Sequence, residues 1–272
     1  MARVIVPEAE QMLDKEFPVL DQGFVRLVDY MGGDARIVAA ARVSYGGGTT
    51  TVRRDKVLID YLMENQHSSP FEQVVLTFHA KMPIFVARQW IRHRTARVNE
   101  ISGRYSVMKD EFYLPEAGQI RKQSKTDRQA RGTEELPRET QERVLEILKR
   151  DQGAAYESYE KLLKDEVARE LARINLPLSL YTQWYWQIDL RNLLHFLNLR
   201  LDEHAQYEIR RYAEVMAKMA KAVAPMAYGA FEEHVLHAVR LSRSKKERLA
   251  KFLRSAASDS EEAADLLKML EG

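Results

Sequence analysis

The feature that most constrains this chain is a polar segment, residues 88–106, which follows an apolar stretch and holds five arginines, one histidine and one glutamate. Pro83 predicts where the preceding helix starts, because a proline at the first helical position loses no backbone hydrogen bond. We therefore predict an amphipathic helix that is anchored in the core and has an unusual polar face. Counted from Pro83, one side of this helix carries Ile84, Val86, Ala87, Trp90 and Ile91, and the other carries Arg88, Gln89, Arg92 and His93.

The second half of the segment, residues 99–106, is rich in residues that are typical of turns. Gly103 allows the backbone to approach a ligand closely, and Ser102 can bond to local backbone or to a ligand. A side-chain amide and a guanidinium followed by a Ser-Gly-Arg loop suit the edge of a planar base and a phosphate. The alternative is a solvated basic face. Trp90, which anchors the helix, and the acceptor Glu100 argue against it, because a simple anion patch needs neither.

Composition sets outer limits on the protein. At 272 residues, 45% hydrophobic and 30% charged, the chain is predicted to be soluble and globular, with one large domain or two small ones. The net charge of +2 gives no support for a nucleic-acid partner. No apolar run approaches the roughly 20 residues that cross a bilayer. The N-terminus lacks a signal-peptide pattern, so we expect no membrane partner and a cytoplasmic location.

The chain contains no cysteine. This absence excludes disulfides, thiolate metal sites and every thiol nucleophile. Any reaction that other enzymes perform with a cysteine thiolate as nucleophile therefore needs a different chemical group in this protein.

The pattern along the chain is compatible with an α+β architecture, because predicted strands and helices are segregated. Residues 1–21 are expected to form a loose N-terminal extension, 22–235 the main domain and 236–272 a charged helical tail. The polar residues 116–142 are expected to be a mobile surface insertion. Strands are predicted at 23–30, 74–79, 111–114 and 178–188, and helices at 34–41 with Asp34 as N-cap, 53–66, 143–172, 190–200 and 202–222.

A second polar region, residues 170–200, ends in a leucine-rich helix. Asp189 is predicted to cap that helix, and Arg191 and His195 lie on its polar stripe. Arg200 falls on the apolar side, where a guanidinium is costly unless it is paired or binds a ligand. Two alternatives stay open at this point: Arg200 pairs with a carboxylate, or the helix ends before it.

The order and spacing of these residues resemble one known family. An Arg-His-Arg triplet at 92–94, followed after seven residues by Ser102, is similar to the signature of the flavin-dependent thymidylate synthases. The flanking Arg-Gln-Trp, the loop at 67–72 and the helix that ends at Arg200 agree with that family in order and spacing. Arg97 departs from the pattern, because the family often has serine there.

The resemblance covers about residues 22–235. It implies a single-domain α+β fold with helices packed on an antiparallel sheet, in a homotetramer whose active sites draw on several subunits. It also implies reductive methylation of dUMP to dTMP. The methylene group would come from methylenetetrahydrofolate, and the reducing hydride from NADPH through FAD. No resident metal is implied.

The resemblance assigns roles to single residues. Arg200 matches the position that activates N3 of uracil, which makes it the expected catalytic residue, and His67 is expected in the vicinity of the folate and NADPH. A negative Asp189 is unfavourable near FAD phosphates, so we expect it to meet adenine or ribose hydroxyls. The positions that match dUMP contacts are Gln89, Arg92, Glu100, Ser102, Gly103, Arg104, Arg173 and Arg200. The positions that match FAD contacts are Ser69, Arg92, His93, Arg94, Glu100, Asp189, Arg191 and His195.

Two other functions are possible on the same residues. One is a nucleic-acid-binding module built on the arginine helix, but the balanced charge and the lack of a basic stripe interleaved with exposed aromatics weigh against it. The other is a metal-dependent nucleotide hydrolase. The chain has seven histidines but no His-Glu-x-x-His pattern. Bound oxidised flavin, which is yellow, would distinguish the flavin-dependent methylation of dUMP from both of these alternatives.

Overall fold

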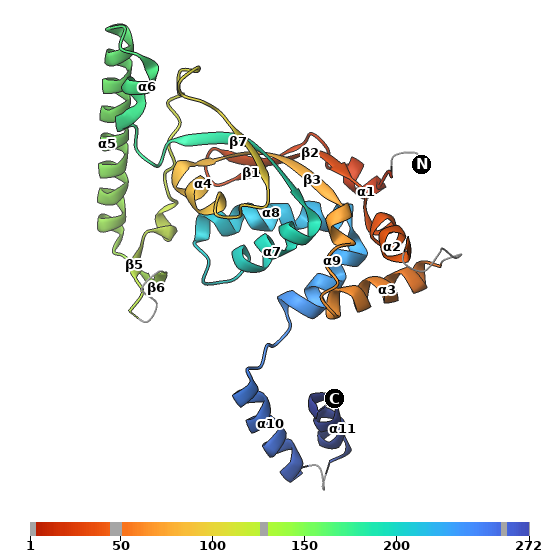
Figure 1. The fold of residues 1–272 in the computed structure, drawn as a ribbon. Coiled ribbons are helices and arrows are strands. Elements are labelled where there is room, and N and C mark those ends of the chain that lie inside the picture. Colours follow the sequence, from red (N-terminus) through yellow and green to blue (C-terminus); the bar gives the residue numbers. More distant parts are fainter. Residues whose placement is uncertain (1–3, 44–50, 126–129, 257–259, 272) are drawn as a thin grey trace. The chain divides into compact units, whose positions relative to one another are not determined.

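The computed structural model describes residues 4–43, 51–125, 130–256 and 260–271. The chain divides into two compact units, Met1–His234 and Val235–Gly272. The larger unit combines an antiparallel sheet with packed helices, so the prediction of an α+β architecture is confirmed (Figure 1). The smaller unit consists of α10 (Arg243–Ala256) and α11 (Glu261–Glu271), which pack against each other. Each helix in the described part of the chain is too short or too polar to span a bilayer.

The main sheet has five antiparallel strands in the order β1-β2-β3-β7-β4. Apolar and polar residues alternate along its central strands, so that one face is buried and the other is half-exposed. β3 and β7 pair along their whole lengths. The strands are β1 (Glu16–Val19), β2 (Gly23–Met31), β3 (Val75–Pro83), β4 (Arg97–Glu100) and β7 (Tyr181–Asp189).

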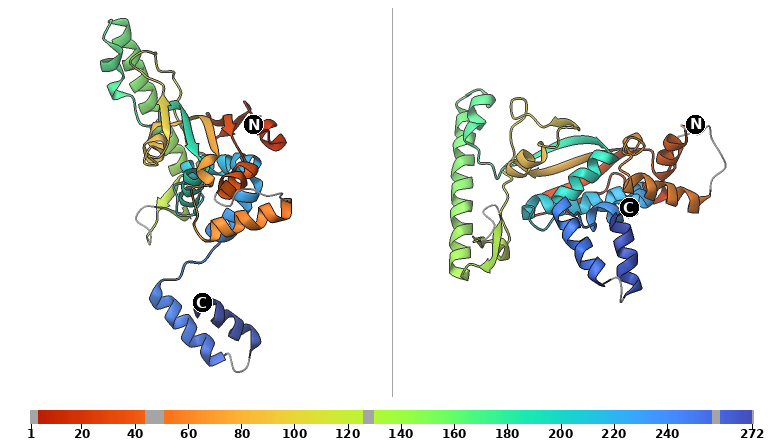
Figure 2. Two further views of the ribbon diagram at one scale, coloured as in Figure 1. Left: turned by 45° about the vertical axis from the view of Figure 1, so that its right-hand side comes forward. Right: turned by 60° about the horizontal axis from the view of Figure 1, so that its bottom comes forward.

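Helices α4, α7 and α8 pack on the buried face of the sheet, while α5 stands at one end and α2, α3 and α9 gather at the other (Figures 1 and 2). The longer helices are α2 (Asp34–Arg42), α3 (Val52–Glu64), α4 (Ile84–Trp90), α5 (Arg138–Lys164), α7 (Leu190–Arg200), α8 (Tyr207–Val223) and α9 (Pro225–Phe231). The short elements are α1 (Pro7–Glu10), η2 (Phe71–Gln73), η3 (Ala117–Gln119), β5 (Arg121–Gln123), β6 (Arg131–Glu135), α6 (Arg169–Ala172), η4 (Arg173–Asn175) and η5 (Glu232–Leu236).

The Trp90 side chain is the centre of the core between the sheet and the helices. It is fully buried. Its ring centroid lies 5.4 Å from that of Trp184 and 5.3 Å from those of Trp186 and Phe196, and Tyr212 is 5.8 Å away. These contacts hold α4 against β7, α7 and α8 at once. The predicted anchoring of the arginine segment in the core is therefore confirmed.

The arginine segment itself is shorter as a helix than predicted. Pro83 is the last residue of β3 and the N-cap of α4, and the helix ends at Trp90. Ile91 is consequently 43% exposed instead of buried. Arg92 and His93 lie in the turn that follows, where the His93 N–H donates to the Trp90 carbonyl at 3.0 Å.

Two predictions about local chain conformation were wrong because tertiary contacts override local preference. Asn99 and Glu100, at the start of the segment predicted to be turn-rich, belong to β4 because residues 97–100 pair with β7, whereas residues 103–105 do form a turn. Asp34 does not cap its own helix, whose N-cap is Gly33. Its carboxylate accepts hydrogen bonds from the backbone N–H groups of Met226 at 2.8 Å and Ala227 at 3.0 Å, and so caps α9.

The described part of the N-terminal extension is packed, not loose. β1 pairs with β2, and Ala9 and Val19 are buried. The Val6 N–H also donates to the Tyr30 hydroxyl at 2.8 Å. The segment folds because its few apolar residues dock on the sheet.

The insertion at 116–142 contains secondary structure that its polar composition did not indicate. β5 and β6 pair as an antiparallel ribbon, and α5 already begins at Arg138. Residues 126–129 lie outside the described residues. The predicted strand at 111–114 is only an isolated bridge from Phe112 to Leu180. The helix predicted from 202 begins at Tyr207, because Asp202 and His204 form a hydrogen-bonded turn.

We predict that replacing Trp90 with alanine lowers the free energy of unfolding by about 3–5 kcal/mol, because it empties a fully packed aromatic site. The matched control is Ile91→Ala, the next residue, which is 43% exposed and should cost less than about 1 kcal/mol. Urea unfolding followed by tryptophan fluorescence and by circular dichroism measures both. Equal losses in the two variants would show that Trp90 is not the centre of the core.

Candidate active site

The turn after α4 meets the C-terminal end of α7 through a contact between His93 and Arg200. Arg200 Nε donates to His93 Nε2 at 3.2 Å. The His93 ring also stands edge-on to Phe196 at 4.9 Å and lies 6.2 Å from the His195 ring. Because Nε2 accepts a hydrogen bond, the imidazole that Arg200 meets is neutral at this nitrogen.

Electrostatics favour the same protonation state. Burial, then the charge of Arg200 and that of His195, lower the pKa of His93 from 6.5 to about 4. Burial also lowers the pKa of the Arg200 guanidinium, which nevertheless stays charged at neutral pH. The pair is thus a cation held by a neutral ring, not an ion pair.

The structure decides between the alternatives for Arg200. The helix includes Arg200 as its last residue, so it does not end earlier. Within the described part of the chain, no carboxylate lies at ion-pair distance from its guanidinium. A half-buried guanidinium without a carboxylate is costly for a protein that has no ligand for it. The arrangement therefore indicates a binding position.

Three other arginines, on the same turn and the same helix as this pair, have no acidic partner among the described residues. Arg92 and Arg94 flank His93 in sequence and are exposed. Arg191 lies one helical turn before His195 on α7, and its only recorded hydrogen bond is to Asn192 Oδ1 at 2.7 Å. Several cations without acidic partners favour a ligand with more than one negative charge.

The N-terminal end of α7 holds two further predicted residues. Asp189 caps the helix, as predicted: its carboxylate accepts from Asn192 N at 2.9 Å and from Asn192 Nδ2 at 2.7 Å. Ser69 precedes the η2 turn, which packs against α7. His67 is exposed and stands edge-on to Tyr61 at 5.7 Å.

A second group forms between the loop after β4 and the α6 region. A Cβ at Gly103 would lie 2.9 Å from Arg173 Cδ, so glycine lets Arg173 pack directly on this backbone. Ser102 Oγ accepts the Arg104 N–H at 3.3 Å. Arg104 Nε pairs with Glu170 at 3.0 Å in an exposed ion pair, which is a weak interaction. Glu100, in the preceding strand, accepts from the Thr182 hydroxyl at 2.6 Å.

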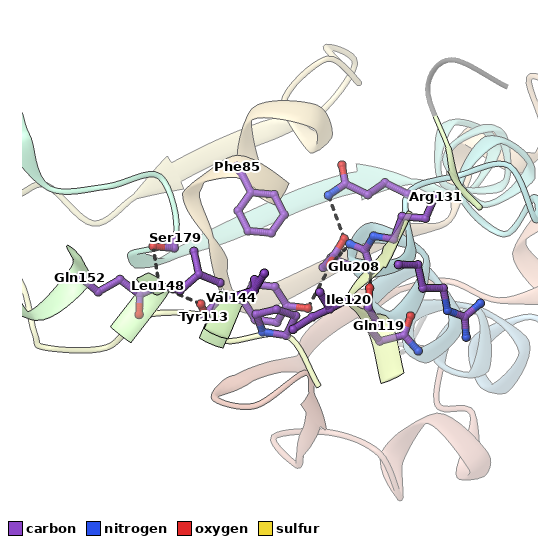
Figure 3. A pocket seen from close by; sticks show the side chains of 13 residues that line it. Phe85, Tyr113, Gln119, Ile120, Arg131, Val144, Leu148, Gln152, Ser179 and Glu208 are labelled. Atoms are coloured by element: carbon purple, nitrogen blue, oxygen red, sulfur yellow. Dashed lines mark hydrogen bonds and ion pairs between the residues drawn. The ribbon is translucent and has the colours of Figure 1, made fainter. Parts of the chain in front are cut away.

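Gln89 points to a third set of residues. Its Nε2 donates to Gln206 Oε1, and Gln206 Nε2 donates to Glu208 Oε2 at 2.8 Å. Glu208 is only 1% exposed and pairs with Arg131 of β6. Glu208 also borders a cavity of about 350 Å³, shown in Figure 3.

Glu208, Gln206 and Arg131 were not among the site residues predicted from the sequence. A signal for Glu208 existed: on α8 it lies one turn before Tyr212 and beside Ile209, on the predicted inward face. A carboxylate there is rarely buried unless it is paired. Arg131 gave no signal, because its partner is distant in sequence.

The structure thus brings the predicted residues together in part. One group contains His93, His195 and Arg200, and another contains Ser102, Gly103, Arg104 and Arg173. Among the described residues, no hydrogen bond, ion pair or ring contact joins these two groups. The described residues also contain no group of three or more potential metal ligands.

In the ligand-free protein, we predict that the His93 ring stays neutral until about pH 4. Between pH 6.5 and about 4 the His93 imidazole is protonated in the unfolded chain but neutral in the folded chain. This difference makes the free energy of unfolding fall as the pH falls. An NMR titration of the imidazole resonances measures the pKa. Arg200→Met should raise it toward 6.5, whereas the control Arg211→Met, on α8, should not. A wild-type ring that titrates near 6.5 would contradict the described contact.

Comparison with known proteins places the chain in a family. Residues 26–226 match the family model described as thymidylate synthase complementing protein. A flavin-dependent thymidylate synthase from Treponema denticola is 60% identical over 241 residues, which cover 89% of this chain and 91% of that protein. One from Treponema pallidum is 56% identical over 242 residues, which cover 89% of this chain and 79% of that protein.

Solved structures agree with the sequence matches. A crystal structure of PolB, a UMP/dUMP methylase from Streptomyces cacaoi bound with 5-Br dUMP, superposes with a TM-score of 0.74 at 34% identity. The match covers 81% of this chain and 99% of that chain. The resemblance that the Arg-His-Arg signature indicated is confirmed, and the chain belongs to the flavin-dependent thymidylate synthase family.

Proposed function

We propose that this protein methylates dUMP to dTMP, with methylenetetrahydrofolate as carbon donor and NADPH as reductant through bound FAD. The observation that carries the proposal is the Arg200 guanidinium, half-buried, held by a neutral His93 and without a carboxylate among the described residues. Family membership supports it, and so does the similarity to a methylase whose structure is described with 5-Br dUMP.

The donors present fit a flavin dinucleotide. A dinucleotide carries a diphosphate, and the exposed guanidinium groups of Arg92, Arg94 and Arg191 have no acidic partner among the described residues. Asp189 is held by the α7 cap, where a carboxylate suits ribose hydroxyls or the adenine amino group better than a phosphate. Ser69 precedes η2, which packs against α7, and His195 lies in the middle of that helix. When bound, the flavin supplies a ring that accepts and delivers hydride.

The Ser102 group suits the nucleotide phosphate. Ser102, Gly103 and Arg104 offer a hydroxyl, backbone N–H groups and a guanidinium, and Arg173 packs against them. The Arg104 pair with Glu170 is exposed and weak, so a phosphate dianion can compete for Arg104. Ser102 acts in binding and not as a nucleophile, because an alcohol needs an adjacent base and its recorded partner is the Arg104 N–H.

Arg200 is the proposed catalytic residue. Uracil C5 becomes nucleophilic when negative charge develops on the ring, and this chain has no thiolate to add at C6. The contact with His93 occupies Arg200 Nε and leaves both terminal amino groups available for a carbonyl oxygen or N3 of the base. A fixed cation at that place stabilises the developing enolate in a desolvated site. His93 is therefore the group that orients Arg200.

We also propose that the active unit is a homotetramer. Among the described residues of one chain, no hydrogen bond, ion pair or ring contact joins the His93–Arg200 group to the Ser102–Arg173 group, although one nucleotide would need both. A neighbouring subunit can supply the second group. His67, exposed on the loop before η2, stays a proposed neighbour of the folate and NADPH.

We predict that the purified protein is yellow and releases FAD on denaturation. With dUMP, methylenetetrahydrofolate and NADPH it should form dTMP, detected by liquid chromatography with mass spectrometry. Omitting either cosubstrate should abolish the product. A colourless protein that also fails to bind added FAD and forms no dTMP would contradict the proposed function.

Sharing of sites between subunits has its own test. Arg200→Ala and Arg173→Ala should each reduce turnover on the order of 100-fold, because each leaves an anionic group unpaired in a desolvated site. Co-assembly of the two variants, verified with different affinity tags, should restore part of the activity. The control pair, His93→Ala with Arg200→Ala, should not recover, because these residues touch within one chain. Mixed assemblies of the first pair that stay inactive would rule out shared sites.

A further inference from the structure

A row of side-chain hydrogen bonds leads from the buried Glu208 to Gln89. Glu208 Oε1 accepts from the Tyr113 hydroxyl at 3.0 Å and from Arg131, and Oε2 accepts from Gln206 Nε2 at 2.8 Å (Figure 3). Gln206 Oε1 then accepts from Gln89 Nε2. In the described structure, Gln89 Oε1 has no recorded donor, so it is the free end of the row.

The carboxylate of Glu208, the first residue of the row, determines the orientation of the side-chain amides of Gln206 and Gln89. An ionised carboxylate accepts hydrogen bonds and cannot donate one. Gln206 must therefore turn its amino group to Glu208, which turns its carbonyl oxygen to Gln89. Gln89 must in turn give its amino group to Gln206. The orientation of both amides follows from the charge of Glu208 and does not depend on telling amide nitrogen from oxygen.

The surroundings of Glu208 keep it ionised. Burial alone would raise its pKa, but the hydrogen bond and charge of Arg131, together with the Gln206 donor, hold the pKa below its ordinary value. Tyr113 faces the same oxygen and donates to it, with its own pKa raised by burial and by Glu208. Arg131 comes from β6, inside the polar insertion, and reaches across to α8.

We propose that Glu208 is a positioning residue that fixes Gln89 with its carbonyl oxygen toward the nucleotide, so that Gln89 recognises a hydrogen-bond donor on dUMP. The inference rests on the proposed function, because it takes dUMP as the ligand of Gln89. The donor is an N–H or O–H group, which on dUMP means N3–H of uracil or the 3′-hydroxyl of the sugar. The insertion thereby has a role in recognition: its Arg131 keeps Glu208 charged.

Glu208→Gln is the variant that tests the orientation. The amide keeps an oxygen for Tyr113 and Arg131 and places an amino group where Oε2 accepted from Gln206. Gln206 then turns its oxygen to residue 208, and Gln89 turns its amino group to the nucleotide, where a donor meets a donor. KM for dUMP should rise about tenfold, the loss of one hydrogen bond. The value of kcat should change by less than about twofold, because the contact serves binding, and FAD content should stay unchanged.

Two further variants separate positioning from simple damage to the fold. Glu214→Gln makes the same change at the Arg211 ion pair on the outer side of α8, and should leave KM unchanged. Gln206→Met interrupts the row while Glu208 keeps Arg131 and Tyr113. In the Gln206→Met background, Glu208→Gln should add no further rise in KM. If Glu208→Gln does not fold, Gln206→Met alone should still raise KM.

Nucleotide analogues identify the donor. Calorimetric titration compares the wild type and Glu208→Gln with dUMP, with 2′,3′-dideoxyuridine monophosphate and with N3-methyl-dUMP. For one of the two analogues, Glu208→Gln and the wild type should have the same affinity. The group that this analogue lacks is then the donor that Gln89 recognises. An equal penalty for all three nucleotides, or none for dUMP, would overturn the inference. A wild type that neither binds nor methylates dUMP would instead refute the proposed function.

Discussion

The packing of Trp90 is the interaction on which the rest of the larger unit depends. Its ring lies among Trp184, Trp186 and Phe196, at centroid distances of 5.3–5.4 Å. The indole N–H groups of the three tryptophans are buried without a recorded acceptor in the described structure, so apolar burial and aromatic packing hold the cluster together. Because the helix ends at Trp90, the polar residues on either side of it are positioned by this one side chain.

The carboxylate of Glu208 and the guanidinium of Arg200 are both removed from solvent in this unit, but they differ in how far their charges are balanced by other residues. The negative charge of the buried Glu208 is balanced by Arg131, and its carboxylate also accepts hydrogen bonds from Tyr113 and Gln206. Glu208 therefore needs no ligand to balance its charge. Arg200, half-buried, meets only the neutral His93 among the described residues, so its site is incomplete. A fold keeps an unsatisfied charge at a cost, and such groups concentrate where a protein binds or transforms something. This contrast separates the residue that supports the site from the residue that acts in it.

The sequence was most informative where local pattern and tertiary structure agree. The strands at 23–30 and 178–188, the Asp189 cap and the apolar arc of α7 follow from alternation, capping and helical spacing. The sequence was least informative where a segment that is distant along the chain determines the local conformation. β4 exists because β7 lies beside it, and Asp34 caps α9 rather than its own helix. The N-terminal segment is ordered because β2 offers an edge.

The candidate site shows the same division. The resemblance of the Arg-His-Arg segment to the family signature identified His93, and the apolar arc singled out Arg200, but their contact joins residues that are far apart in sequence. Glu208 was visible only as a carboxylate on an inward helical face, and Arg131 was not visible at all. Pairwise contacts between distant segments are what a single sequence does not contain.

The most direct test of this account is a crystal structure of the protein with FAD and dUMP bound. The account predicts the FAD diphosphate within hydrogen-bond distance of the guanidinium groups beside His93 and on α7, and the uracil ring against the terminal amino groups of Arg200. It also predicts the nucleotide phosphate at Ser102 and Arg173. A complex in which Arg200 pairs with a carboxylate, and both ligands lie away from it, would contradict the account.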